Sequence, residues 1–159
     1  MNEVSINKNV KLSEHFKLAE LCKTSYITAD GNIPSRVAIE NLKRLCVEWL
    51  EDLRYIYNQL YGDGSQEIPV VITSGYRSPE VNRLCGGSPT SNHLTGCAVD
   101  IRCMGPEQLI RYATILLDMA DDSDSEFDEV LFEKRASKYW LHFAVRPKEN
   151  RRKILFDMR

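Results

Sequence analysis

The sequence lacks the segments that carry proteins into or across a membrane. Its first sixteen residues contain no apolar core and no small-residue cleavage site, so no secretory signal is predicted. No apolar run approaches the roughly 18 residues that a membrane-spanning helix needs. We therefore expect a protein that is cytoplasmic as synthesised and has no membrane insertion. Its 159 residues suffice for one domain with a sizeable core, and we expect a single domain over residues 1–159.

The sequence also has no net positive charge and no CxxC pair of cysteines. The net charge is −2 and the basic residues form no stripe, so the sequence gives no case for binding nucleic acid. The cysteine count is odd and no two cysteines form a CxxC pair, which argues against a cysteine-based metal site and a full disulfide framework. We expect them to be buried thiols; they are Cys22, Cys46, Cys85, Cys97 and Cys103.

The hydrophobic pattern predicts helices and strands that do not alternate as βαβ units. Helices are expected at Ser13–Cys22, from just after Pro34 to about Leu60, after Ser78, and at Pro106–Met119. Strands are expected at Ile68–Thr73, Cys97–Arg102, Phe127–Glu133, Trp140–Val145 and near Ile154–Phe156, with an exposed loop at Asp121–Glu126. This order predicts an α+β fold with a small, mostly antiparallel sheet and helices packed against one face.

Two of the three histidines lie where a strand could bring them to a carboxylate. Side chains alternate along a strand, so Asp100 projects from the face opposite to the apolar Val99 and Ile101. Gly96 allows a sharp turn between this strand and His93, which can then fold back over the carboxylate. The same alternation places His142 opposite to the core-facing side chains of its own strand.

These three side chains form a plausible set of zinc ligands if their strands share a sheet. Two imidazoles and one carboxylate suit Zn²⁺, and three protein ligands leave a fourth position for water, as in catalytic sites. The alternative is that each histidine packs in the core and that the aspartate caps a turn. Spacing alone does not decide between the two, because short motifs often match by chance.

A family resemblance adds to this pattern. The segment Ser91–Asp100 (SNHLTGCAVD) resembles the Ser-x-His-x-x-Gly-x-Ala-x-Asp signature of the zinc D-Ala-D-Ala carboxypeptidase family. Thr73–Pro79 (TSGYRSP) is similar to the turn that precedes this signature in the family. Trp140–His142 resembles the motif with the last histidine ligand. Leu12–Phe16 and Glu149–Arg152 are similar to the ends of the compact, phage-type members.

The resemblance implies the hedgehog/DD-peptidase fold and one zinc ion held by His93, Asp100 and His142. It also implies a metallopeptidase whose partner is the peptide of bacterial peptidoglycan. Arg77 resembles the arginine that steadies the polarised carbonyl oxygen, although a salt bridge that pins its turn is an equal alternative. Ser91 resembles a serine near the ends of the substrate. Tyr76 is a candidate to line the cleft, with surface packing as its alternative.

The general base departs from the family pattern. Members usually carry an acid or a histidine two or three residues before the last ligand, where this chain has Tyr139 and Trp140. The nearest acid is Glu133, which is similar in placement to a glutamate of the hedgehog signalling domain. We expect Glu133 to take a proton from the attacking water and to pass it to the leaving amine. The alternative is a salt bridge to Lys134, Arg135 or Lys138.

Three functions follow from these patterns. The first is a monomeric zinc carboxypeptidase or endolysin-like endopeptidase that acts at the cell wall, reached after phage lysis or by another route. The second is a zinc-bound or metal-free module that binds peptidoglycan or a protein without cleaving it. The third is a structural module of a phage particle with a decayed site. The displaced general base keeps the second function open.

Overall fold

The computed structural model describes residues 6–159, which form an α+β fold around one five-stranded sheet. The strands lie in the order β1-β2-β4-β3-β5, and all neighbours are antiparallel except β3 and β5, which run parallel. This confirms the predicted fold class. The bounds of the strands are Ile72–Ser74 (β1), Ala98–Cys103 (β2), Glu129–Arg135 (β3), Lys138–Ala144 (β4) and Lys153–Met158 (β5).

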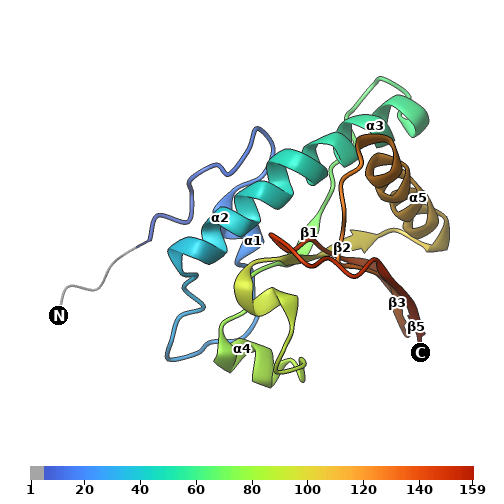
Figure 1. Ribbon diagram of the computed structural model, residues 1–159. Helices are drawn as coiled ribbons and strands as arrows, with labels where there is room; N and C mark the ends of the chain where they lie inside the picture. The colour runs from blue at the N-terminus through green and yellow to red at the C-terminus, as the bar shows by residue number, and fades with distance from the viewer. Residues whose placement is uncertain (1–5) are drawn as a thin grey trace.

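One long helix and a second shorter one cover one face of this sheet (Figure 1). The long helix consists of α2 (Arg36–Leu45), a π-helical segment η1 (Cys46–Leu50) and α3 (Glu51–Tyr61), and it begins where the hydroxyl of Ser35 accepts a hydrogen bond from the Ala38 N–H. The second is α5 (Pro106–Ser123), which packs on β2 and β4. The long helix was predicted from its apolar spacing and α5 from its start at Pro106; α5 runs four residues further than predicted.

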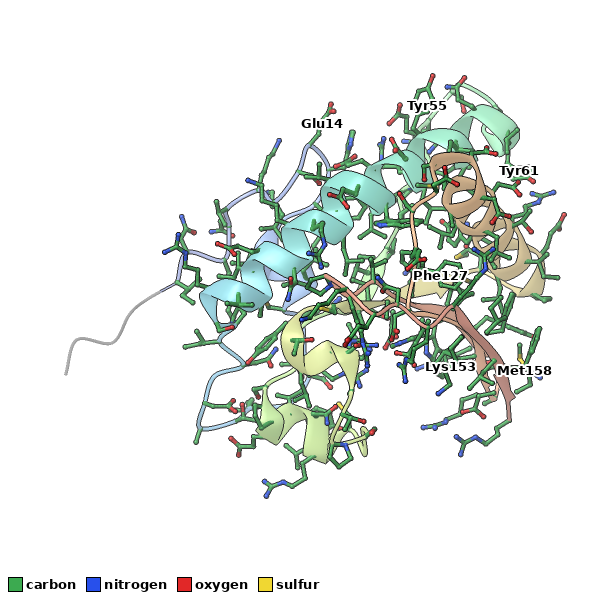
Figure 2. All side chains as sticks on the ribbon, in the orientation of Figure 1. Glu14, Tyr55, Tyr61, Phe127, Lys153 and Met158 are labelled. Atoms are coloured by element: carbon green, nitrogen blue, oxygen red, sulfur yellow. The ribbon has the colours of Figure 1, made fainter. Side chains whose placement is uncertain are left out.

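The long helix buries one side and exposes the other. Leu53 and Tyr57 of α3 are buried, whereas Tyr55 and Tyr61 point away from the sheet at the surface (Figure 2). The ring of Trp49 in η1 meets that of Phe143 on β4 edge to face, with 5.1 Å between ring centroids. This contact fixes the helix against the strand that carries His142.

Three short helical segments complete the chain. They are α1 (Leu18–Leu21), α4 (Pro79–Leu84) and the 3₁₀ turn η2 (Asn92–Thr95). The start of α4 follows its prediction, because the hydroxyl of Ser78 accepts from the Val81 N–H and Pro79 occupies the first turn. Figure 1 shows α4 on the side of the sheet away from α2 and α3. The sheet therefore has helices α2, α3 and α5 on one face and the α4–η2 segment near the other.

Several predicted boundaries were wrong. The first helix covers only Leu18–Leu21, because the Leu12 N–H bonds to the carbonyl of Phe16 and Ser13 donates to Glu51 instead of capping a helix. The first strand covers only Ile72–Ser74; just before it, the Val71 carbonyl accepts from the Arg102 N–H, but residues 68–71 lie outside the strand.

The ends of later elements also differ from prediction. The loop predicted at Asp121–Glu126 is shorter, because α5 continues to Ser123. Cys85 is exposed, which corrects the expectation of five buried thiols; the other four are buried. No helix among residues 6–159 is both long enough and apolar enough to cross a membrane.

The predicted alternation of side chains on β2 and β4 is confirmed. Val99 and Ile101 on β2 are fully buried on the helix-covered side, as are Leu141 and Phe143 on β4. Asp100 lies directly opposite His142 in the register of these two strands, so their side chains share the other face.

Candidate metal centre

A cleft of about 470 Å³ lies over the sheet face that carries Asp100 and His142. Residues from β2, β3, β4 and the α4–η2 segment line it. The lining residues include Arg77, Ser91, Asn92, His93, Asp100, Glu129, Leu131, Glu133, Arg135, Trp140 and His142. The cleft therefore contains nearly every site residue predicted from the sequence.

His93 is held by a turn that fixes its backbone and one ring nitrogen. The hydroxyl of Ser91 accepts a hydrogen bond from the His93 N–H at 3.2 Å, and Gly96 ends the turn with φ of +72°. His93 Nδ1 lies 2.6 Å from the carbonyl oxygen of Gly75, which only accepts, so Nδ1 carries the proton. The other nitrogen, Nε2, is left with a lone pair that faces Asp100 Oδ1 at 3.3 Å.

His142 is held between two carboxylates. Its Nδ1 lies 3.0 Å from Asp100 Oδ1, and its Nε2 lies 3.3 Å from Glu129 Oε1. Because a carboxylate accepts, Nε2 donates to Glu129, and this leaves Nδ1 as the nitrogen that can bind a metal. A ligand histidine whose second nitrogen donates to a carboxylate or carbonyl is common around bound metals. His93 and His142 both have this arrangement.

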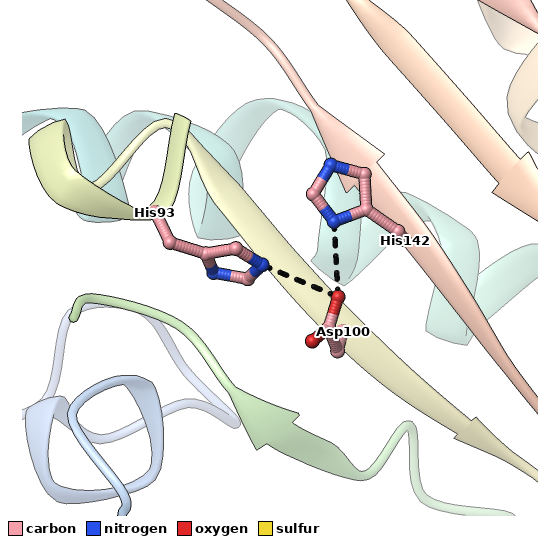
Figure 3. A group of neighbouring side chains, drawn as sticks. All are labelled: His93, Asp100 and His142. Atoms are coloured by element: carbon pink, nitrogen blue, oxygen red, sulfur yellow. Dashed lines mark hydrogen bonds and ion pairs between the residues drawn. The ribbon is translucent and has the colours of Figure 1, made fainter. Parts of the chain in front are cut away.

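The three groups converge on one point in the cleft (Figure 3). One ligand atom from each of His93, Asp100 and His142 lies within 4.8 Å of the others, and all three residues are buried. Zinc bonds of about 2.0–2.1 Å in a tetrahedral site put ligand atoms about 3.3 Å apart. The two contacts of Asp100 Oδ1, at 3.3 and 3.0 Å, are close to that spacing. The residues therefore fit a zinc ion.

Burial and charge act in opposite directions on these groups. Burial lowers the pKa of His93 below its ordinary value, which keeps the imidazole neutral. Burial alone would raise the pKa of Asp100, but the two histidines beside it hold that pKa well below its usual range. Burial also opposes a charge on His142, yet its hydrogen bonds with Asp100 and Glu129 raise its pKa to about 9. A proton on His142 thus supplies positive charge between the two carboxylates.

Arg77 reaches the same carboxylate from the other side. Its Nη2 donates to Asp100 Oδ2 at 3.0 Å and its Nε donates to the hydroxyl of Ser74 at 3.0 Å. The salt bridge that the sequence left as an alternative is thus present, and it leaves Asp100 Oδ1 to face the histidines. Arg77 also lines the cleft, so its remaining N–H groups are available there.

The two predicted substrate-binding residues have different positions. Ser91 lines the cleft and caps the turn that carries His93. Tyr76 is not among the lining residues; its side chain is 7 % exposed and packs in the hydrophobic core. The Tyr76 N–H bonds to the carbonyl of Leu21 at 2.7 Å, which draws this residue into the protein. The prediction that Tyr76 lines the cleft is therefore corrected.

Glu133 lies on the cleft-facing side of β3, directly opposite Trp140 of β4. In residues 6–159 no ion pair joins it to Lys134, Arg135 or Lys138, the partners of the alternative reading. Burial raises the pKa of Glu133, and the nearby charge of Asp100 raises it further. A carboxyl group with a raised pKa and no bound cation is suited to exchanging protons.

A second glutamate in the cleft was missed from the sequence. Glu129 occupies the same face of β3 as Glu133, and its Oε1 accepts from Asn92 Nδ2 at 2.6 Å as well as from His142. These hydrogen bonds, first that with His142, lower the pKa of Glu129. The sequence does predict this position. Side chains at even spacing along a strand share one face, so a strand that directs Glu133 into the cleft also directs Glu129 there, four residues earlier.

A buried carboxylate supports this second glutamate from behind. Asp128 is fully buried and accepts from Asn92 Nδ2 at 2.7 Å and from Arg151 Nη2 at 2.7 Å. Arg146 Nε donates to Asn92 Oδ1 at 3.2 Å and so fixes the amide from its other side. The side chain of Asn92 is thus oriented by several charged groups, and its amide in turn fixes the position of the Glu129 carboxylate.

An α+β fold that buries two histidines and one aspartate together in a cleft is typical of a metallohydrolase. A family model described as Peptidase M15 matches residues 14–121, more than half of the chain. The protein belongs to this family of peptidases, which confirms the resemblance to the zinc D-Ala-D-Ala carboxypeptidases. The matched part includes Arg77, His93 and Asp100 but ends before β3 and β4. No curated protein matches the chain.

Proposed function

We propose that this protein is a zinc-dependent peptidase that hydrolyses peptide bonds in the stem peptides of bacterial peptidoglycan. The observation that carries the proposal is the convergence of His93 Nε2, Asp100 Oδ1 and His142 Nδ1 in an open cleft. Electron-rich atoms at such distances repel one another unless a cation or a proton lies among them. Membership in the peptidase M15 family supports zinc as that cation.

In this proposal three residues bind the metal, and neighbouring groups keep those three side chains in position. Gly75 and Glu129 keep the second ring nitrogen of each histidine occupied, and Arg77 does the same for Asp100 Oδ2. Bound zinc supplies Lewis-acid polarisation of a carbonyl group and lowers the pKa of water. Three protein ligands leave room for this chemistry at a fourth position.

Glu133 and Glu129 have different roles in this proposal. The raised pKa of Glu133 suits a general base that takes a proton from the attacking water and returns it to the leaving amine. The lowered pKa of Glu129 suits a permanent anion that orients His142. In many active sites, two carboxyl groups whose environments give them different pKa values take different roles, one exchanging protons and the other staying ionised.

The other cleft residues bind substrate in this proposal. Arg77 has N–H groups beyond those bound to Ser74 and Asp100, and these can donate to the carbonyl oxygen of the bond under attack. Ser91 lies beside His93 in the same cleft and offers a hydroxyl group to the peptide. Residues 1–159 act as one domain at the cell wall in this proposal, as a carboxypeptidase or as an endopeptidase.

Digestion of purified peptidoglycan combined with metal analysis tests the proposal. We expect about one zinc per chain and the release of D-Ala or of stem-peptide fragments, lost with a chelator and restored by zinc. The released product distinguishes a carboxypeptidase from an endopeptidase. Glu133→Gln should keep the zinc and lose at least about a hundredfold in rate, as expected for a general base.

The matched control is Glu126→Gln, since Glu126 is an exposed acid outside the cleft. It should retain both zinc and activity. A Glu133→Gln protein with full activity would remove Glu133 from the mechanism. No release from any wall chemistry despite bound zinc would instead support a module that binds peptidoglycan or a protein without cleaving it.

A further inference from the structure

The outermost strand of the sheet, β5, has an unpaired edge and exposed apolar side chains. It pairs with β3 on one side, and no other strand in residues 6–159 pairs with its outer side. Every residue of β5 is exposed, and the apolar ones have exposed fractions of 41 % (Ile154), 47 % (Leu155), 68 % (Phe156) and 47 % (Met158). Natural proteins usually protect such an edge with a bulge, a proline, a covering segment or charged side chains. Among residues 6–159, β5 has only the last of these, in Lys153 and Asp157.

The backbone groups at this edge can be assigned from the pairing with β3. The Lys153 N–H donates to the carbonyl of Asp128 and the Arg159 N–H donates to that of Lys134, both at 2.9 Å. Because these groups alternate along a strand, the odd-numbered residues of β5 bond to β3. The N–H and C=O groups of Ile154, Phe156 and Met158 therefore point outward, toward any strand that adds to the sheet.

We propose that β5 pairs with β5 of a second copy of this chain, in an antiparallel register centred on Leu155. A two-fold axis through a strand edge requires antiparallel pairing of identical strands. In such a pair, residues whose backbone N–H and C=O groups point outward must lie opposite one another. The two-fold axis must therefore pass through the position of one residue of β5, not between two residues. Only the registers centred on Leu155 and on Phe156 pair five residues of the strand with one another.

Charge distinguishes these two registers. With Leu155 at the centre, Lys153 lies opposite Asp157 of the second copy, and this pair occurs twice in the dimer. With Phe156 at the centre, Lys153 lies opposite Arg159 of the second copy, which places like charges together twice. Opposite charges across an antiparallel pair stabilise it and like charges destabilise it. The sequence of β5 therefore favours the first register.

The apolar side chains fit the same register. Ile154 lies opposite Phe156 of the second copy, and their backbone groups point toward each other. The ring of Phe156 already stacks on Phe132 of β3, with 4.6 Å between centroids and 13° between ring planes. Each dimer therefore gains two Ile154–Phe156 contacts next to an ordered aromatic pair, which covers the most exposed apolar side chain of the strand.

At the ends of this register Arg151 lies opposite Arg159 of the second copy, and Arg151 is bound to Asp128 of its own chain. Asp157 pairs with Arg159 of its own chain and also faces Lys153 of the second copy, so this register alone brings opposite charges together across the interface. The two-fold axis is perpendicular to the sheet, so the two clefts open on the same face of one continuous sheet. The proposed dimer differs from the expectation of a monomer, and it does not depend on whether the protein is a peptidase.

Sedimentation equilibrium of the full chain over a wide concentration range tests this interface. We expect reversible association to twice the chain mass of 18.3 kDa. Lys153→Glu and Asp157→Lys each put like charges opposite one another at two places, so each should raise the dissociation constant about tenfold or more. The double variant restores both pairs and should regain the dimer. A mixture of the two single variants should also form a dimer, because each supplies the charge that the other lacks.

Lys43→Glu on α2 is the matched control, since it reverses an exposed lysine far from β5 and should leave the dimer unchanged. Circular dichroism of each variant establishes that it is folded. A chain that stays at 18.3 kDa at the highest concentration would overturn the proposal. So would a dimer that neither single variant weakens, because that dimer would use another surface.

Discussion

Glu129 Oε1 lies 3.3 Å from His142 Nε2, the ring nitrogen that does not face Asp100. Asn92 Nδ2 donates to the same oxygen at 2.6 Å, so the carboxylate has little freedom to turn. The imidazole of His142 is thereby held with Nδ1 toward the centre of the cleft. This contact links a proposed zinc ligand on β4 to a carboxylate on the neighbouring strand β3, and the orientation of His142 depends on both strands.

Removal of this carboxylate should weaken zinc binding. Glu129→Ala takes away the acceptor for His142 Nε2, and loss of such an outer partner typically costs about ten- to a hundredfold in metal affinity. Glu129→Gln keeps an oxygen acceptor for both His142 and Asn92, so its loss should be smaller. Competition with a chromophoric chelator measures the dissociation constant of zinc for each protein. Equal affinity in the wild type and Glu129→Ala would show that the contact does not orient the ligand.

Zinc binding should release a proton near neutral pH. The metal-free protein holds the pKa of His142 at about 9, because hydrogen bonds with Asp100 and Glu129 outweigh the effect of burial. At pH values below 9 a metal must displace that proton, so the apparent affinity should rise about tenfold per pH unit from 7 toward 9. Calorimetric titrations in two buffers with different heats of ionisation count the protons. A count near zero at pH 7 would contradict a protonated His142.

Gly96→Ala should destabilise the fold more than Gly86→Ala. Both glycines have φ of +72°, but a Cβ atom at Gly96 would lie 2.4 Å from the carbonyl oxygen of Ala38, whereas one at Gly86 would meet nothing within 4 Å. We expect a loss of about 1 kcal/mol for Gly86→Ala, from backbone strain alone. The loss for Gly96→Ala should reach about 3 kcal/mol or more, because backbone must move. Urea unfolding of the two variants measures the difference, and equal losses would contradict the clash.

Asp128→Asn should destabilise the protein in a pH-dependent way. Burial alone would raise the pKa of Asp128, but hydrogen bonds from Arg151 and Asn92 lower it to about 2 from the ordinary 3.8. A depressed pKa stabilises the folded state above about pH 4, and this contribution disappears as the pH falls toward 2. We expect the free energy of unfolding to fall by up to about 2 kcal/mol near neutral pH, with the gap to the wild type closing in acid.

Asp121→Asn is the control for that experiment. Asp121 also pairs with an arginine, Arg152, but both side chains are largely exposed, so the pair contributes little. Chemical unfolding at several pH values compares the two variants with the wild type. A constant gap for Asp128→Asn between pH 2 and pH 7 would mean that its charge does not stabilise the fold.

The sequence allowed the cluster to be predicted because its strands alternate clearly. Asp100 and His142 each lie between buried apolar neighbours, and a single register brings both to the same face. His93 followed from Gly96, whose left-handed backbone turns the chain back toward the strand. Local patterns and one pairing of strands made this cluster possible, and the family resemblance of Ser91–Asp100 decided for it over packed histidines and a capping aspartate.

Other features depend on contacts that local patterns do not contain. Leu12–Phe16 reads as the start of a helix, but Ser13 and His15 bind Glu51 of α3 instead. Tyr76 follows a glycine that packs against the backbone of Leu21, so its side chain enters the core. Both outcomes depend on tertiary contacts with distant segments, and the spacing of residues along the chain does not predict which segments will be in contact.

The pairing of β2 with β4 also sets an order of events during synthesis. Some forty residues, including α5 and β3, separate Asp100 from His142. A growing chain that has emerged only as far as α5 has His93 and Asp100 but lacks the last ligand and the carboxylate behind it. If these residues bind zinc as proposed, high metal affinity arises only after β4 has left the ribosome and joined the sheet, when only β5 has still to be added.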